Sequence, residues 1–427
     1  MSSNNVKHSK LKNNSKADIR QENQKTILRA AEQIFAEYGF RGATTKMIAE
    51  LAGIPKANLH YYYPTKLDLY QKIVENIFEI WLSAADAFDN NTNPVDALSR
   101  YIDEKMALAR SHPYSSKVWA NEVMHGAPII QDYLETNLAQ WTKAREANIQ
   151  GWIDDGLLDP IEPKHLLYMI WATTQHYADF NHQIQTLNGG DPLSDQQWEN
   201  ASRDVKKIIL AGVGARNASL KPATARPELK TRIQRQKTEH ILSAALEVFS
   251  NFGFRGSTID QIAAQADMSK PNILYYFDSK EAIHSQLLER LLATWLKPLQ
   301  QLNENGEPIE EILAYIQRKL QMSRDFPRES RLFANEVLQG APHITRLIGG
   351  ELKSLVDQKT ALIRSWCQAG KISPLDPHHL IFAIWATTQH YADFDAQIRA
   401  LMGADSANRY QNAEVFLEQL FKTALKP

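Results

Sequence analysis

Residues 253–280 read GFRGSTIDQIAAQADMSKPNILYYFDSK, and residues 39–66 read GFRGATTKMIAELAGIPKANLHYYYPTK. Each stretch contains a threonine that can cap a short apolar helix, Thr44 or Thr258, and continues through a brief turn into a second short helix. A helix, a brief turn and a second helix form the unit that places its second helix in the DNA major groove. The sequence therefore predicts two copies of a DNA-reading unit.

The duplication extends beyond these two stretches. The segment WATTQHYADF at residues 171–180 recurs unchanged at residues 385–394, an offset of 214 positions, and the same offset relates Trp81 to Trp295. A repeat of domain size indicates a duplicated unit rather than a solenoid of short repeats. Residues 212–228 are rich in alanine, proline and glycine and lack hydrophobic periodicity, so we interpret them as a linker between the copies.

Local patterns are helical almost throughout. For example, apolar residues between Ile27 and Phe35 recur at helical spacing. Gly39 follows them, and glycine is the residue that a helix end favours. We therefore expect an all-α protein of two tandem units. Its expected segments are a basic N-terminal arm (1–20), a first helix-turn-helix domain (21–70), a first helical regulatory domain (71–211), a linker and second arm (212–234), a second helix-turn-helix domain (235–284) and a second helical regulatory domain (285–427).

Composition excludes several classes of protein. The chain has 427 residues, a formal net charge of −1 and one cysteine, Cys367, so it cannot form an intrachain disulfide or a cysteine-rich zinc site. It contains no apolar run long enough for a membrane helix, and its first ten residues do not resemble a secretory signal. We expect a cytoplasmic protein without membrane contact.

Charge is unevenly distributed along the chain. Residues 1–70 carry 11 basic and 6 acidic residues, and residues 216–284 carry 10 basic and 7 acidic residues. Two basic zones in an otherwise acidic protein favour two contacts with a polyanion, although two solvated faces would give the same pattern.

The second helix of each unit carries residue types that suit DNA. Lysine contacts guanine or phosphate, asparagine pairs with adenine, and tyrosine hydroxyls reach phosphate oxygens. A lysine at the start of the next helix can meet a phosphate together with the helix N-terminus. The candidate DNA contacts are Thr44, Lys56, Asn58, His60, Tyr61, Tyr62 and Lys66 in the first copy, and Thr258, Lys270, Asn272, Tyr275, Tyr276 and Lys280 in the second.

A basic arm precedes each unit. Such an arm can follow the DNA backbone or enter the minor groove, or it can be a solubilising tail. The arm residues are Lys7, Lys10, Lys12, Lys16 and Arg20 before the first copy, and Arg226, Lys230, Arg232, Arg235 and Lys237 before the second.

The front of each copy resembles the TetR family of transcriptional regulators. The resemblance rests on Asn272-Ile-Leu-Tyr-Tyr-Phe277 with Ser279-Lys280 behind it; the first copy departs from that pattern at Pro55, His60, Tyr63 and Pro64. Members of this family act as homodimers on near-palindromic double-stranded DNA operators. The resemblance therefore implies that the two units here form a pseudo-dimer within one chain.

The rear of each copy is similar to the RutR-type subgroup of this family, which senses the pyrimidine bases uracil and thymine. The similarity rests on Trp81-Leu82, on Asn121-Glu-Val123 with Gly-Ala-Pro at residues 126–128, and on the repeated segment at 171–180. It implies a small planar effector, uracil or thymine, that releases the DNA or alters its binding.

The repeated segment can also be interpreted physically. Tyr168, Trp171, Gln175 and Asp179 share one helical stripe. An aromatic surface with a primary amide suits a flat ring bearing adjacent C=O and N–H groups, whereas a packing or pairing surface is the other interpretation. The candidate ligand contacts are Trp81, Trp171, Gln175, Asp179, Trp295, Trp385, Gln389 and Asp393.

Catalysis finds little support in the sequence. His176 and Asp179 stand three residues apart, but no third metal ligand of suitable spacing accompanies them, and no Walker loop or nucleophile elbow is present. We therefore predict no enzyme, no cofactor and no metal site. The alternative function is a ligand sensor or interaction protein in which only the second copy reads DNA.

Overall fold

The computed structural model describes residues 16–84, 93–214 and 234–427. Within these ranges the chain forms helices and turns and no strand, which confirms the all-α prediction. None of the helices described is both long and apolar enough to cross a membrane.

In its described residues, the first unit forms eleven α-helices in chain order, with a π-helical turn at Leu134–Leu138 ahead of α8. They are α1 (Lys16–Gly42), α2 (Thr45–Ala52), α3 (Lys56–Tyr62), α4 (Lys66–Ser83), α5 (Pro94–Ser111), α6 (Pro113–Met124), α7 (Gln131–Tyr133), α8 (Ala139–Asp154), α9 (Pro163–Asp179), α10 (Asn181–Leu187) and α11 (Asp195–Gly212).

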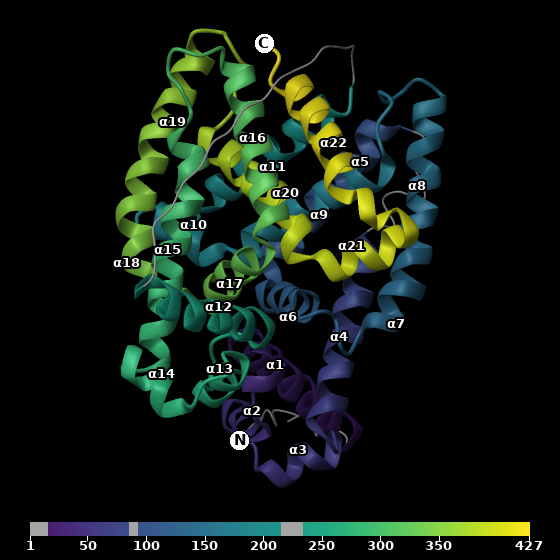
Figure 1. Cartoon of the computed structure of the whole chain (residues 1–427). Helices are drawn as coiled ribbons and strands as arrows, with labels where there is room; N and C mark the ends of the chain where they lie inside the picture. The colour runs from purple at the N-terminus through teal and green to yellow at the C-terminus, as the bar shows by residue number, and fades with distance from the viewer. Residues whose placement is uncertain (1–15, 85–92, 215–233) are drawn as a thin grey trace, which may run out of the picture.

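The second unit repeats this order, so that each of its helices corresponds to one of the first unit (Figure 1). They are α12 (Gln234–Phe252), α13 (Ile259–Gln265), α14 (Lys270–Tyr276), α15 (Lys280–Gln300), α16 (Pro308–Asp325), α17 (Pro327–Leu338), α18 (Thr345–Leu347), α19 (Lys353–Gln368), α20 (Pro377–Asp393), α21 (Asp395–Met402) and α22 (Arg409–Ala424).

Glycine bends the chain at the end of the first long helix of each unit. Gly39 and Gly253 both have a φ of +65°, a conformation that costs residues with a side chain considerably more than glycine. The predicted helix end at Gly39 is therefore present as a sharp bend, after which the chain turns toward α2.

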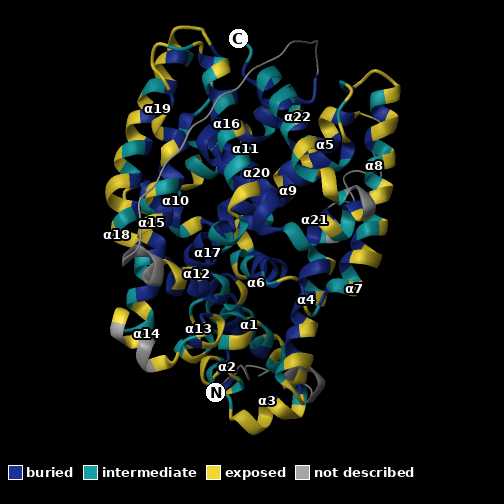
Figure 2. Cartoon of the chain, in the orientation of Figure 1, coloured by how far each residue is buried: buried dark blue, intermediate teal, exposed yellow. Residues whose placement is uncertain are grey.

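The helices α9 and α20 lie at the centre of the molecule and pack against each other (Figures 1 and 2). Every residue of α9 is buried except Lys164, and every residue of α20 except His378. A helix that is buried on all sides belongs to a core. The core of this protein is therefore shared by its two units.

Contacts between the units are reciprocal. Nδ1 of His165 lies 2.5 Å from the hydroxyl of Tyr391, and the corresponding pair in the opposite sense, Tyr177 and His379, is separated by 2.7 Å. The helices α11 and α22 also pack together. Reciprocal contacts of this kind are what a two-fold interface between identical subunits produces, and here they lie within one chain.

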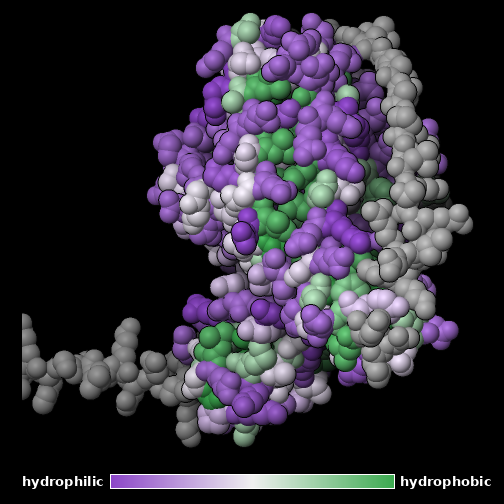
Figure 3. Space-filling model, turned by 60° about the vertical axis from the view of Figure 1, so that its left-hand side comes forward, coloured by the Kyte–Doolittle hydropathy of each residue, from purple (hydrophilic) through white to green (hydrophobic). Residues whose placement is uncertain are grey.

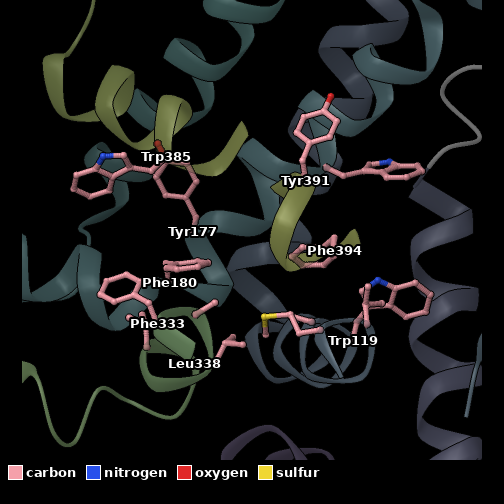
Figure 4. Close-up of a cluster of buried hydrophobic side chains, with 14 of the residues drawn as sticks. Trp119, Tyr177, Phe180, Phe333, Leu338, Trp385, Tyr391 and Phe394 are labelled. Atoms are coloured by element: carbon pink, nitrogen blue, oxygen red, sulfur yellow. The ribbon is translucent and has the colours of Figure 1, made fainter. Parts of the chain in front are cut away.

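The apolar contacts between the two units are reciprocal as well. Figure 4 shows Trp119 of the first unit near Phe394 of the second, and Phe333 of the second unit near Phe180 of the first. Because the four side chains are buried, the junction excludes water and gains hydrophobic stabilisation.

The two DNA-reading units also touch. The guanidinium of Arg41 lies 4.3 Å from the centre of the Phe252 ring, and that of Arg255 lies 4.1 Å from the centre of the Tyr38 ring. Arg255 additionally donates a hydrogen bond to the carbonyl of Glu37 at 3.2 Å. These contacts fix the readers relative to each other in the state described.

Hydrophilic residues prevail on the face that Figure 3 presents, with apolar residues gathered in a strip between them.

Of the residues predicted to form the two basic arms, only Arg20 has a described side chain; it lies on α1 and is exposed. Six arm residues lie outside the described residues: Lys7, Lys10, Lys12, Arg226, Lys230 and Arg232. Lys16, Arg235 and Lys237 lie in α1 and α12, but their side chains are outside the description. The predicted linker also lies largely outside the described residues.

Candidate functional site

The predicted helix-turn-helix units lie at one end of the molecule, with α3 and α14 outermost (Figure 1). Thr44 caps α2 by accepting a hydrogen bond from the Met47 amide at 3.2 Å. Thr258 caps α13 with a reciprocal pair to Gln261, the capping box expected from the sequence. Both threonines therefore fix the helix that precedes the reading helix.

The turn into each reading helix requires a left-handed residue. Gly53 fills this position in the first unit with a φ of +65°, and Asp267 fills it in the second with a φ of +49°. Aspartate tolerates this conformation better than most residues because its short side chain can bond locally. The two turns therefore share a left-handed backbone conformation, although different residues adopt it.

In the first unit, the predicted contacts of α3 face solvent. Lys56, Asn58, His60 and Tyr61 are exposed (Figure 2), Tyr61 by 73%. Nδ1 of His60 lies 3.0 Å from the carbonyl oxygen of Pro64, which can only accept a hydrogen bond, so Nδ1 carries the proton. In a neutral ring Nε2 is then an acceptor.

The second unit presents a different surface. Leu274 and Tyr276 are exposed, whereas Lys270 forms an ion pair with Asp260 at 2.8 Å. An exposed ion pair contributes at most about 1 kcal/mol, so Lys270 can exchange this partner for DNA at small cost. The side chains of Asn272 and Tyr275 lie outside the described residues.

Four tyrosines (Tyr61, Tyr62, Tyr275 and Tyr276) and two lysines (Lys66 and Lys280) were predicted to reach phosphates. Tyr62 is half-buried, and its hydroxyl accepts a hydrogen bond from Asn23 of α1 at 3.3 Å. The ammonium of Lys66 donates to the carbonyls of Phe40 and Ala43 at 2.6 and 2.9 Å. Lys280 repeats this with Phe254 and Ser257 at 2.8 and 2.9 Å.

In the structure these lysines bond the protein backbone, and their contact with phosphate stays a prediction. Each ammonium also lies over a phenylalanine ring, at 4.5 Å for Lys66 and 4.2 Å for Lys280, and burial lowers both pKa values. Because its bonds go to the segment after α1 or α12, each lysine ties the start of α4 or α15 to its reader.

A small cavity lies inside the regulatory part of the first unit. Its volume is about 30 Å³, enough for roughly two water molecules. Its walls are mainly aromatic and come from α4, α5, α6, the π-helical turn, α8 and α9, with one residue from α21 of the other unit. They are Phe78, Trp81, Tyr101, Lys105, Trp119, Leu138, Trp141, Trp171, Gln175 and Gln397.

Gln175 and Lys105 place polar side chains at this cavity. The side-chain nitrogen of Gln175 is buried without a hydrogen-bond partner among the described residues. Lys105 is 4% exposed, its ammonium lies 4.3 Å from the centre of the Trp81 ring, and burial lowers its pKa to about 8. Both groups can donate hydrogen bonds to an acceptor placed inside.

Two further hydrogen bonds hold the walls. The indole of Trp171 donates to the hydroxyl of Tyr101 at 2.8 Å. The indole of Trp119 donates to the side-chain oxygen of Gln397 at 3.0 Å. The second bond joins the two units, so the cavity of the first unit is completed by the second.

A second cavity of about 20 Å³ lies at the junction of the units and is lined by both repeated segments. There Asp179 accepts a hydrogen bond from Ser116, and Asp393 one from Ser330, each at 2.6 Å. Burial raises the pKa of both carboxyl groups to about 7. Burial lowers the pKa of His176 to about 3, so this imidazole is neutral at pH 7.

The predicted ligand residues are thus divided among three places. Trp81, Trp171 and Gln175 meet in the first cavity, and Gln175 also borders the second. Asp179, Trp385, Gln389 and Asp393 border the second cavity. Trp295 lines a separate cavity of about 290 Å³ beside α12, α15 and α17.

Sequence reasoning missed several lining residues. Tyr101 and Lys105 recur as Tyr315 and Lys319, and this shared offset is a signal that would have found them. Trp119 and Trp141 correspond to Phe333 and Leu355, so the repeat does not mark them. Gln397 enters through the contact between units.

Comparisons with known proteins agree with this architecture. The sequence profile described as "Bacterial regulatory proteins, tetR family" matches residues 27–73 and 241–287. The profile described as "YcdC-like protein, C-terminal region" matches residues 74–216 and 288–427.

Similar curated proteins cover about half of the chain each. HTH-type transcriptional regulator RutR of Escherichia coli O157:H7 is 49% identical over 190 residues, 44% of this chain and 87% of the relative. The protein of the same name from Escherichia coli K12 is 48% identical over the same shares. HTH-type transcriptional repressor KstR2 of Mycobacterium tuberculosis H37Rv is 23% identical over 190 residues, 44% of this chain and 90% of the relative.

The profile for the reader and the profile for the regulatory region each match twice, in the order that the fold shows, and together they span most of the chain. The chain therefore belongs to the TetR family of bacterial transcriptional regulators, DNA-binding proteins that are not enzymes, and contains two units of that family in tandem.

Proposed function

We propose that this regulator acts as a covalent pseudo-dimer whose two readers bind one double-stranded DNA operator, and that uracil, thymine or a similar flat ring changes that binding. The observation that carries the ligand proposal is the aromatic cavity of the first unit, where the amide nitrogen of Gln175 lacks a partner beside the buried ammonium of Lys105.

The chemistry of the cavity selects the kind of ring. Two hydrogen-bond donors, from Gln175 and Lys105, call for carbonyl acceptors on the ligand. Aromatic walls favour a flat ring over an aliphatic one of the same size. A pyrimidine with two ring carbonyls meets both demands, and entry requires the walls to separate because the cavity has room for only about two waters.

Helix α4 connects this cavity to the reader. Phe78 and Trp81 near its end line the cavity, and Lys66 at its start holds the backbone after α1. A ring that displaces Trp81 would therefore tilt α4 and move the reader with it. A ligand shifts such an equilibrium only through its different affinity for the two states, which here are the closed and opened cavity.

Ligand binding is tested by titration calorimetry with uracil and thymine, and with unsubstituted pyrimidine as a ring that lacks carbonyls. We expect heat from the first two alone. Gln175→Ala should weaken binding by about 1–3 kcal/mol because a ligand carbonyl loses its buried donor.

Gln389→Ala is the matched control, since Gln389 borders the junction cavity but not the aromatic one. It should reduce affinity less than Gln175→Ala. Absence of heat with both bases, or equal loss in the two variants, would contradict the proposed site.

Assembly has its own test. The proposed pseudo-dimer rests on the reciprocal contacts of α9 with α20 and of α11 with α22 inside one chain. Light scattering on a dilution series should therefore give about 49 kDa, the mass of one chain, since the chain weighs 48.6 kDa. A particle of twice this mass that persists on dilution would show that pairing between chains is required.

A further inference from the structure

A buried cluster of His284, Glu336 and His343 distinguishes the second unit from the first. His284 lies on α15, Glu336 lies on α17, and His343 lies in the segment between α17 and α18. One ligating atom of each residue falls within 4.8 Å of those of the other two. The side chains of His284 and Glu336 are 1% exposed and that of His343 is 17% exposed.

The first unit shows how the same framework is satisfied without this cluster. There Glu122 accepts hydrogen bonds from the Ile129 amide at 2.7 Å and from the Tyr70 hydroxyl at 2.9 Å. Both oxygens of the buried carboxylate therefore have a donor, and the corner is complete.

In the second unit histidines stand in place of Tyr70 and Ile129. The amide of His343 donates to Oε1 of Glu336 at 2.7 Å, as the Ile129 amide does to Glu122. Oε2 of Glu336 then faces Nδ1 of His343 at 3.1 Å and Nδ1 of His284 at 3.8 Å. Nδ1 of His284 is buried and has no hydrogen-bond partner in the described part of the chain.

We propose that this cluster binds a divalent transition-metal ion, zinc first among them, through Nδ1 of both histidines and Oε2 of Glu336. Two imidazoles and a carboxylate with a fourth position left for water form a donor set that zinc commonly accepts. Zinc bonds of about 2.0–2.2 Å place tetrahedral neighbours about 3.3–3.5 Å apart, between the two separations present here. The ion would give the orphaned nitrogen of His284 its missing partner.

The surroundings fit a closed site. The ring of Phe254 lies 4.6 Å from that of His284 and 4.5 Å from that of His343, measured between ring centres, so an aromatic wall shields both ligands. The ligands join α15, which begins at the second reader, to α17 and the segment behind it. A bound ion would therefore fasten this reader to its regulatory domain, in place of the hydrogen bond between Tyr70 and Glu122 that joins α4 to α6 in the first unit.

The test is calorimetric titration of the full chain with Zn²⁺ after removal of metal by a chelator. We expect one ion per chain and a rise in the unfolding temperature on its addition. His284→Tyr and His343→Ile restore the residues of the first unit, whose packing shows that the framework accepts them. Each should weaken zinc binding by roughly 100-fold or more, since loss of groups that merely orient ligands already costs 10–100-fold.

Two further variants sharpen the test. Tyr70→His with Ile129→His builds the cluster around Glu122 and should raise the stoichiometry to two ions. His378→Ala removes a half-exposed histidine outside the cluster and should leave binding unchanged. Saturation with Co²⁺ should give the visible absorption of a tetrahedral site in the wild type and lose it in His284→Tyr.

Two results would overturn the proposal. One is the lack of saturable zinc binding in the wild type, which would make the cluster an ordinary pair of His343 and Glu336. The other is stoichiometric zinc binding of wild-type affinity in those of the two variants, His284→Tyr and His343→Ile, that fold. Because the two variants remove different ligands, failure of one to fold leaves the other as a decisive measurement.

Discussion

Selection from random DNA should return an imperfect palindrome, with two half-sites that differ at a few base pairs and a protein bound in one preferred orientation. A homodimer presents identical reading helices, and its ideal site is symmetric. In this chain the helices read PKANLH at residues 55–60 and SKPNIL at residues 269–274. The shared lysine and asparagine should keep part of each half-site alike.

We expect the two half-sites to differ at the base pairs that face His60 in one half-site and Leu274 in the other. Because the Pro64 carbonyl holds the proton on Nδ1 of His60, Nε2 of the neutral ring is an acceptor. It suits the amino group of adenine or cytosine in the major groove. Leu274, 39% exposed, offers only apolar contact and suits a thymine methyl.

Exchange of the reading segment tests this directly. Replacing residues 55–60 by the sequence of residues 269–274 should make the selected site symmetric and cost roughly 1–3 kcal/mol on the original site for each base pair that no longer matches. The converse exchange should give the other symmetric site and serves as the matched control. A symmetric consensus from the wild type would contradict the prediction, and a single half-site would show that only the second copy reads DNA.

Much of the fold could be predicted because its signals are local. The caps Thr44 and Thr258 and the bend at Gly39 act within a few residues, so their patterns stand complete in the sequence. The backbone contacts of Lys66 and Lys280 could not be predicted in this way. Their carbonyl partners lie 23 and 26 residues earlier, and a lysine that begins a helix looks the same whether it meets a phosphate or a backbone oxygen.

The sequence allowed prediction of those cavity residues that lie together on one helix. Trp171 and Gln175 share a stripe of α9 and meet in the cavity. The sequence left open whether this helix lines a pocket or pairs the units, and in the structure it does both: α9 packs against α20 and also borders both cavities. Gln397 was not predictable, because its place in the first unit's cavity follows from how the units meet.

Trp119→Ala should be among the most damaging single substitutions in the regulatory region, with a loss of about 3–5 kcal/mol in the free energy of unfolding. Trp119 is 1% exposed and lies between ring neighbours, with its ring centre 5.1 Å from that of Trp81 and 6.3 Å from that of Phe78. Removing the indole leaves a cavity at the junction and an unpaired oxygen on Gln397. Urea unfolding followed by circular dichroism measures the loss.

Trp119→Phe separates the two causes, because phenylalanine already occupies the corresponding position of the second unit, Phe333. It keeps most of the apolar volume but loses the donor to Gln397, so about 1–3 kcal/mol should be lost. Adding Gln397→Leu removes the stranded oxygen, and the double variant should regain part of that loss. If Trp119→Ala and Trp119→Phe were equally stable, cavity formation would not be the main cost.

The same pair of variants connects stability with sensing. Trp119 lines the aromatic cavity and its indole bonds Gln397 of the opposite unit, so a ring that enters the cavity and shifts Trp119 also strains the junction. Trp119→Phe removes that bond before any ligand arrives. It should therefore lower the cost of opening the cavity and weaken the coupling between ligand and DNA binding, measured as the ratio of operator affinities with and without ligand. A ratio identical to that of the wild type would show that the signal leaves the cavity through α4 alone.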